Sequence, residues 1–386
     1  MDWTADLNRT FFSHPGRGHR PTQRQPTPSL QPVGVSSGRI VRRRINRDSP
    51  PCQPAFVAPS LALGRQLRYQ QRQPHTRRSD AAPGAAHQAS FMTGFIQAFH
   101  QRASRALGQH FLTDQSALQA IARDTRAAPG RVVLEIGPGP GVLTHALLQT
   151  GARVVAIEKD RRAVEFLQTT FRDMIGDDAS ARLTVIEGDA LAQPPHALLD
   201  GVGPQPWLAA GNLPYNIATA ILTLFLTDAP HFERWTFMFQ KEVAQRLVAQ
   251  PNSKAYGSLS LAVAARTDPL LIRTLPPGAF APPPKVDSAV VSFSVRDTPR
   301  LDPALLPTFE RLARAAFSKR RKTIRNSLRY GLSHLTPEAL DSLLARANVS
   351  PRSRAEQLPF DDFVALTLAL HDLQAHADSN AAPPSD

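Results

Sequence analysis

The chain has 386 residues, of which 42% are hydrophobic and 35 are prolines, and its net charge is +13. This length allows two domains and additional segments. No run of about 18 apolar residues is present, which excludes a membrane-spanning helix, and we expect no membrane partner. The single cysteine, Cys52, excludes an internal disulfide and a cysteine-based metal site. We therefore predict no bound metal and a reducing, cytoplasmic location.

The positive charge is concentrated in the first hundred residues. This segment holds fourteen arginines, no lysine and only four acidic residues. The remainder, with 31 basic and 28 acidic residues, is close to neutral. The net charge is therefore no argument by itself that the folded part of the chain binds nucleic acid.

Residues 1–91 are rich in Arg, Pro, Gln and Ser and have no sustained apolar period. Such a segment buries too little apolar surface to offset its ordering entropy, so we predict a disordered extension. Its composition resembles an organelle transit peptide, although the scattered prolines break an amphipathic helix. A tail that tethers RNA is a second interpretation. We favour a third, in which the natural protein begins at Met92.

Apolar runs and helical patterns alternate from Ser104 onward. Asp114 begins a helical pattern that extends to Ala122, and further helical spacing follows between the apolar runs. Strands that alternate with helices predict a parallel sheet covered on both faces, in an α/β domain over residues 92–298. The predicted strands are Val132–Ile136, Val154–Ile157, Leu183–Ile186, Trp207–Ala210, Trp235–Phe239 and, after a proline run, Ser288–Val295.

A second, smaller region follows Pro299, where the strand patterns stop. Helical spacing continues to about Leu373, so we predict an all-helical domain over residues 299–375. Residues 376–386 are predicted to form a disordered tail.

The first predicted strand leads into a glycine-rich turn, Gly137-Pro138-Gly139-Pro140-Gly141, and then into a helix. Glycines there let the backbone approach a ligand and adopt positive φ, although a tight turn alone also needs them. The next strand ends at Glu158, about 20 residues after Gly137, where a carboxylate accepts hydrogen bonds from ribose in nucleotide-binding folds. The third ends near Asp189, which can accept from an adenine amino group. NAD and S-adenosylmethionine both remain possible; the irregular glycine spacing favours the latter.

The fourth strand ends in the motif Asn212-Leu213-Pro214-Tyr215. The N6 amine of adenine is a weak nucleophile because its lone pair is delocalised into the ring. The Asn212 amide oxygen and the Pro214 carbonyl can accept both amine hydrogens, which aligns the nitrogen without a general base. Tyr215 offers a face on which an extruded base can stack.

These motifs together resemble the ribosomal RNA adenine N6,N6-dimethyltransferases, and within them the bacterial small-subunit type. The resemblance extends from about Ser104 to Phe363. Its matching stretches are Leu107–Leu112, Glu135–Gly139, Asn212–Tyr215, Gln240–Val243, Pro282–Ser288 and Arg320–Leu328.

The resemblance implies a Rossmann-like class I methyltransferase sheet with a small C-terminal all-helical domain, and S-adenosylmethionine as methyl donor. It implies that the target base lies between Tyr215 and Phe280. The implied substrate is two adjacent adenosines in a 3′-terminal stem-loop of small-subunit rRNA, in an immature 30S-type particle, and we expect a monomer. The implied donor-binding residues are His110, Leu112, Gly137, Gly139, Glu158, Asp189 and Asn212.

The chain departs from this family at His110, where the family usually has Asn. One ring nitrogen of histidine can still donate or accept a hydrogen bond, so we expect the contact to survive. The pH dependence of that contact stays open.

Residues 317–329 contain six basic side chains and no acid. At 100° per residue Phe317, Ile324 and Leu328 share one line, so we predict a helix that packs by this edge. A charge run is more often a solvated face. The missing acids and the family resemblance favour phosphate contact, with Lys319, Arg321, Lys322 and Arg325 as the RNA-binding residues.

Three other functions remain open. A large-subunit methyltransferase of the macrolide-resistance type shares the fold and the Asn motif. A ribosome assembly factor or organellar transcription factor has this fold without the chemistry, although the intact Asn212–Tyr215 motif disfavours it. A DNA adenine methyltransferase is disfavoured because no inserted recognition domain is visible.

Overall fold

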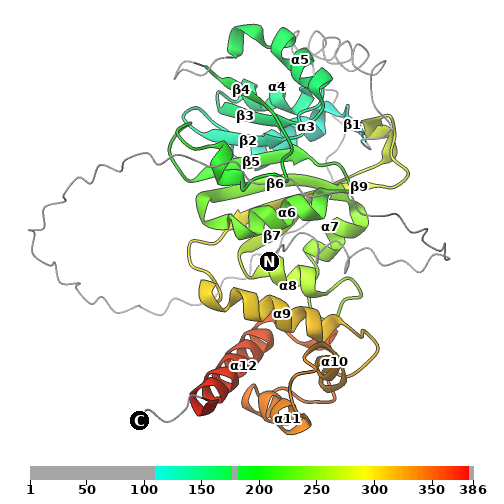
Figure 1. The fold of residues 1–386 in the computed structure, drawn as a ribbon. Coiled ribbons are helices and arrows are strands. Elements are labelled where there is room, and N and C mark those ends of the chain that lie inside the picture. Colours follow the sequence, from blue (N-terminus) through cyan, green and yellow to red (C-terminus); the bar gives the residue numbers. More distant parts are fainter. Residues whose placement is uncertain (1–108, 176–180, 382–386) are drawn as a thin grey trace, which may run out of the picture. The chain divides into compact units, whose positions relative to one another are not determined.

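The computed structural model describes residues 109–175 and 181–381. Its main feature is a seven-stranded mixed sheet with the order β4-β3-β2-β5-β6-β9-β7 (Figure 1). The predictions for residues 1–91 lie outside the described residues. None of the helices in the described part combines the length and apolar composition of a membrane crossing.

Five neighbouring strands are parallel, as predicted. Buried apolar side chains dominate β3 and β6, and all five side chains of β2 are buried. Their bounds are β2 Val132–Ile136, β3 Arg153–Glu158, β4 Leu183–Glu187, β5 Trp207–Asn212 and β6 Phe232–Gln240.

Two further strands complete the sheet. The predicted strand β9 (Ser288–Val295) is antiparallel to β6, and β7 (Thr267–Leu275) pairs with β9 at the edge. The sequence analysis missed β7. Half-buried side chains and Pro269 weaken its strand pattern, and proline is tolerated there because the strand lies at the sheet edge.

A separate two-stranded ribbon joins distant parts of the chain. Strands β1 (Phe111–Leu112) and β8 (Phe280–Ala281) are antiparallel, with Leu112 opposite Phe280. This pairing brings the Gln109–Leu112 segment next to the proline run that begins at Pro282.

The helices of the sheet region follow the predicted alternation. Helix α3 begins as expected, because the Asp114 side chain accepts a hydrogen bond from Ala117 N at 3.0 Å. The helices are α3 Gln115–Asp124, α4 Val142–Gln149, α5 Arg161–Thr170, α6 Ala218–Thr227, α7 Lys241–Leu247 and α8 Ser258–Ala264, with short 3-10 turns at η2 Arg172–Met174, η3 Pro195–Leu198, η4 Ala229–His231 and η5 Pro277–Ala279.

The strand order reverses between β2 and β5. Strand β2 pairs with β3 on one side and with β5 on the other, all in parallel. In open α/β sheets, ligands bind beyond the carboxyl ends of the strands at such a reversal. The glycine turn after β2 and the Asn212–Tyr215 motif after β5 both lie at this point.

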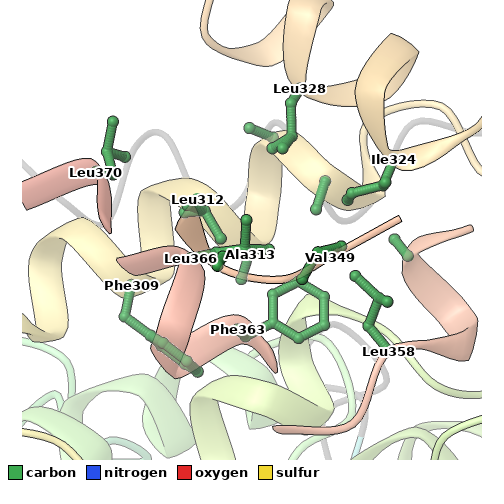
Figure 2. Packing of buried hydrophobic residues seen from close by; sticks show 14 of the residues in the cluster. Phe309, Leu312, Ala313, Ile324, Leu328, Val349, Leu358, Phe363, Leu366 and Leu370 are labelled. Carbon is green, nitrogen blue, oxygen red and sulfur yellow. The ribbon is translucent and has the colours of Figure 1, made fainter. Parts of the chain in front are cut away.

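Four helices follow the sheet: α9 (Leu306–Phe317), α10 (Ile324–Gly331), α11 (Pro337–Arg346) and α12 (Phe360–Ala381), with 3-10 turns at η6 Pro303–Leu305 and η7 Ala355–Gln357. Buried side chains from α9, α10 and α12 point toward one another in a common core (Figure 2). The same core includes Tyr256 and, from α8, Leu261. The helical region is thus present as predicted, but it shares its core with a helix that precedes residue 298.

Two predictions for this region were wrong. The helix predicted over residues 317–329 is broken: α9 ends at Phe317, and α10 begins at Ile324 after Thr323 as N-cap. Phe317 and Ile324 pack into the same core from two different helices. The helical spacing of apolar residues does not show that the chain turns between them. Helix α12 continues to Ala381, into the segment that was predicted from residue 376 as a disordered tail.

Candidate functional site

A pocket of about 180 Å³ lies at the β2/β5 reversal. Eight of the ten residues predicted to bind the methyl donor or the target base line it. They are His110, Leu112, Gly137, Gly139, Glu158, Asn212, Pro214 and Tyr215. Asp189 and Phe280 are not among the lining residues.

The glycine turn has the backbone geometry that the sequence predicts. Gly137 and Gly139 have φ of 66° and 55°, in the left-handed region that favours glycine. A Cβ on Gly139 would lie 2.8 Å from Cε1 of Phe111, which is buried. Gly139 therefore serves both the turn and the close approach of Phe111.

We expect Gly139→Ala to lower the free energy of unfolding more than Gly130→Ala. Gly130 has φ of 78° and open space around its Cβ position, so both variants place alanine in the left-handed region and only Gly139→Ala adds a clash. The expected difference is about 1 to 3 kcal/mol, measured by denaturant titration. Equal losses would mean that Phe111 moves aside freely.

Glu158 holds the turn in place from the end of β3. One carboxylate oxygen accepts a hydrogen bond from Gly139 N at 3.0 Å and the other accepts from Asp160 N at 2.8 Å. Burial raises the pKa of this carboxyl, while these backbone donors oppose the shift. Each oxygen keeps a second lone pair for a ligand hydroxyl.

Glu135, in β2, also lines the pocket, and the sequence analysis gave it no role. Its side chain is fully buried, and its Oε2 has no hydrogen-bond partner among the described residues. Burial raises its pKa to about 8, and the nearby Glu158 carboxylate adds to the shift. The acidic residue before the glycine turn was visible in the sequence, but its burial was not.

Asp189 lies beyond β4, outside the pocket lining. Its Oδ2 accepts a hydrogen bond from Lys159 Nζ at 2.8 Å, and this bond lowers its pKa. Lys159 itself lines the pocket. The predicted contact of Asp189 with an adenine amine therefore stays a prediction. The ion pair with Lys159 was not predicted, because the two residues are 30 positions apart in the sequence.

The Asn212 amide is oriented by the backbone. Its Nδ2 donates to the carbonyl of His110 at 2.7 Å, which fixes the nitrogen on that side because a carbonyl only accepts. The Oδ1 has no hydrogen bond to other described residues. It remains an acceptor in the pocket, which suits the predicted hold on an amine hydrogen.

Pro214 and Tyr215 follow in the same turn. The Pro214 carbonyl already accepts from Ile217 N at 3.1 Å, so one lone pair remains for an amine. The hydroxyl of Tyr215 bonds to Ser288 Oγ at 2.5 Å, and its ring stacks on His110. The structure thus brings a polar acceptor and an aromatic face together.

Phe280 is only 4% exposed and belongs to the core cluster of the sheet. In this structure its ring faces that core. Its predicted place beside the target base stays a prediction.

The predicted RNA-binding residues occupy two different environments. Lys319, Arg321 and Lys322 are exposed in the turn between α9 and α10, and none has an acidic partner in the described part of the chain. Arg325 forms a two-pronged ion pair with Asp341, with hydrogen bonds of 2.6 and 2.8 Å. Of these four residues, the three without an ion pair among the described residues therefore lie in the turn, where Lys319 Nζ is also 5.6 Å from the centroid of the Tyr330 ring. We call Lys319–Lys322 the basic turn.

His196, Asp228 and His231 form a cluster with ligand atoms within 4.8 Å of one another. Asp228 Oδ1 accepts from His196 Nδ1 at 2.6 Å and lies 3.2 Å from His231 Nδ1, while Oδ2 accepts from His196 N. Hydrogen bonds within the cluster satisfy the buried carboxylate and link η3 to η4. The absence of a metal stays a prediction.

The comparisons with known proteins agree with the motifs. The family described as ribosomal RNA adenine dimethylase matches residues 100–372. The chain belongs to this family. It is 45% identical over 280 residues to ribosomal RNA small subunit methyltransferase A of Ruegeria sp. (strain TM1040), which covers 71% of this chain and 95% of the relative. The protein of the same name from Geobacter metallireducens is 41% identical over 269 residues, or 70% of this chain and 96% of that one.

Solved structures give the same fold. A dimethyladenosine transferase from Plasmodium falciparum is similar with a TM-score of 0.56 and 26% identity, over 68% of this chain and 98% of that one. The 23S rRNA methyltransferase ErmE is similar with a TM-score of 0.53 and 25% identity, over 68% and 99%. The predicted class I methyltransferase sheet followed by helices is confirmed.

Proposed function

We propose that this protein transfers methyl groups from S-adenosylmethionine to N6 of two adjacent adenosines in a 3′-terminal stem-loop of small-subunit rRNA. The oriented acceptor Oδ1 of Asn212 is the observation that carries the proposal. Relatives of 41–45% identity that are named small subunit methyltransferases support the choice of subunit. Immature small subunits in the cytoplasm are the corresponding substrate.

The residues of the pocket fit S-adenosylmethionine. Glu158 offers lone pairs to ribose hydroxyls, and Glu135 offers an unpartnered oxygen to a cationic ligand. The bound donor supplies a methyl group on a sulfonium. Asn212 and Pro214 then hold the amine and align its nitrogen, and Tyr215 supports the extruded base. The methylated nitrogen is acidic enough to lose its proton to water.

The test is methyl transfer from a labelled donor to immature small subunits, large subunits and DNA. We expect label in the small-subunit rRNA, on adenosines that a digest resolves as N6,N6-dimethyladenosine. Label confined to large subunits would assign the chain to the type represented by ErmE. The absence of label from all three would contradict the proposal and favour an assembly factor.

We expect the affinity for S-adenosylmethionine to rise between pH 6 and 8 and to level off above. With a pKa of about 8, Glu135 is mostly protonated in the free protein at pH 7. A cationic ligand favours the ionised carboxylate, so binding releases a proton and weakens as the pH falls. Calorimetry over this pH range measures the effect. Glu135→Gln keeps the shape without the titration, and a pH dependence unchanged in this variant would assign the effect to another group.

A further inference from the structure

His110 contacts Asn212, Tyr215 and Pro282. Its backbone carbonyl accepts from Asn212 Nδ2 at 2.7 Å, and its Nδ1 lies 2.8 Å from the carbonyl of Pro282. Because a carbonyl only accepts, Nδ1 carries the hydrogen of this bond. The imidazole stacks on Tyr215 with ring centroids 5.7 Å apart and 27° between the planes.

The Tyr215 ring is fixed at two points. Its hydroxyl is bonded to Ser288 at 2.5 Å, and its face is covered by His110, which is itself bonded to Pro282. Ser288, which bonds to the hydroxyl, and Pro282, which bonds to His110, both belong to the segment Pro282–Ser288. Phe280, the other ring expected beside the base, is buried in the core. In this structure His110 is therefore the ring that orients Tyr215.

We propose that His110 is a positioning residue for the target base, on which it acts through Tyr215. This proposal rests on the proposed function. A ring held at its face and at its hydroxyl needs no reorientation when a base stacks on it, so less entropy is lost in the step that brings N6 to Asn212. The asparagine that the family usually has at this position offers no ring for the stack.

A double-mutant cycle with His110→Ala and Tyr215→Ala tests the proposal. We expect His110→Ala to lower kcat/KM for small subunits by about three- to tenfold, the range of an aromatic pair. In the Tyr215→Ala background the same change should have no further effect. Additive losses would overturn the proposal, because His110 would then act independently of the tyrosine.

Donor affinity separates this role from a cofactor contact. The dissociation constant for S-adenosylmethionine, measured by calorimetry without RNA, should change by a smaller factor than kcat/KM in His110→Ala. A loss of donor affinity as large as the loss of kcat/KM would overturn the proposal. His110→Phe retains the ring, so its kcat/KM should lie nearer the parent than that of His110→Ala. If the alanine variant does not fold, His110→Asn replaces it in the cycle.

The outcomes distinguish this proposal from the proposed function. If the parent methylates adenosine in a different RNA, the choice of substrate fails and the cycle is measured on that RNA. If the parent methylates no RNA, both proposals fail. Additivity in an active parent overturns the role of His110 alone.

Discussion

Asn212→Ala is expected to lower kcat for methyl transfer to small subunits by about 100- to 1000-fold, the range for loss of one oriented polar group at a reacting centre. In the proposed reaction, the amide oxygen accepts a hydrogen of the N6 amine and aligns its nitrogen. The hydrogen bond from Nδ2 to the carbonyl of His110 means that this oxygen is in place before substrate arrives. Single-turnover rates with saturating donor measure the chemical step.

Asn216→Ala is the matched control for this variant. Asn216 also lines the pocket, but it is exposed and lies outside the strand-end motif. We expect a change in its rate of less than about threefold, as for a surface substitution. A rate in Asn212→Ala equal to that of the parent would remove the amide from the mechanism. If Asn212→Ala lowered the affinity for S-adenosylmethionine by the same factor as the rate, Asn212 would act in donor binding alone.

The combined variant Lys319→Ala, Arg321→Ala and Lys322→Ala is expected to weaken binding to small subunits by about a hundredfold at moderate salt. Each phosphate contact releases counterions and adds about 0.7 to the slope of log affinity against log salt concentration for a single strand, so three contacts add about 2. The three side chains are exposed and lack acidic partners in the part of the chain that the structure describes. Filter binding over a salt series measures both quantities.

Arg325→Ala provides the contrast. Its guanidinium is paired with Asp341, so a phosphate contact would require this pair to break. We expect a smaller change in slope than any single substitution in the basic turn gives. An unchanged slope in the triple variant would place the RNA contact outside the basic turn.

The sequence predicts the sheet well where strands are buried on both faces. The run Val132–Ile136 is apolar except for one residue and coincides with β2. Strand β7 was not predicted, because an edge strand needs no continuous apolar run and tolerates Pro269. The break between α9 and α10 had only a local signal, the Thr323 side chain that accepts from Asn326 N at 3.4 Å.

The site was predictable to the extent that it lies at strand ends. Motifs that follow neighbouring parallel strands meet at one edge, so Gly137, Glu158 and Asn212 could be placed together. Contacts across long sequence distances could not be predicted. The bond from His110 to Pro282 spans 172 positions, and the raised pKa of Glu135 depends on burial that no local pattern reveals.

The core that α8 shares with the C-terminal helices determines where the protein can be divided. Tyr256, Leu261 and Ala265 pack among the side chains of α9 to α12, and Arg266 forms an ion pair with Glu310 at 2.9 Å. A truncation at residue 298 would leave these apolar side chains uncovered and Arg266 without its partner. Such an exposed patch promotes aggregation. Exchange of the C-terminal helices between relatives therefore requires the α8 surface to be exchanged with them.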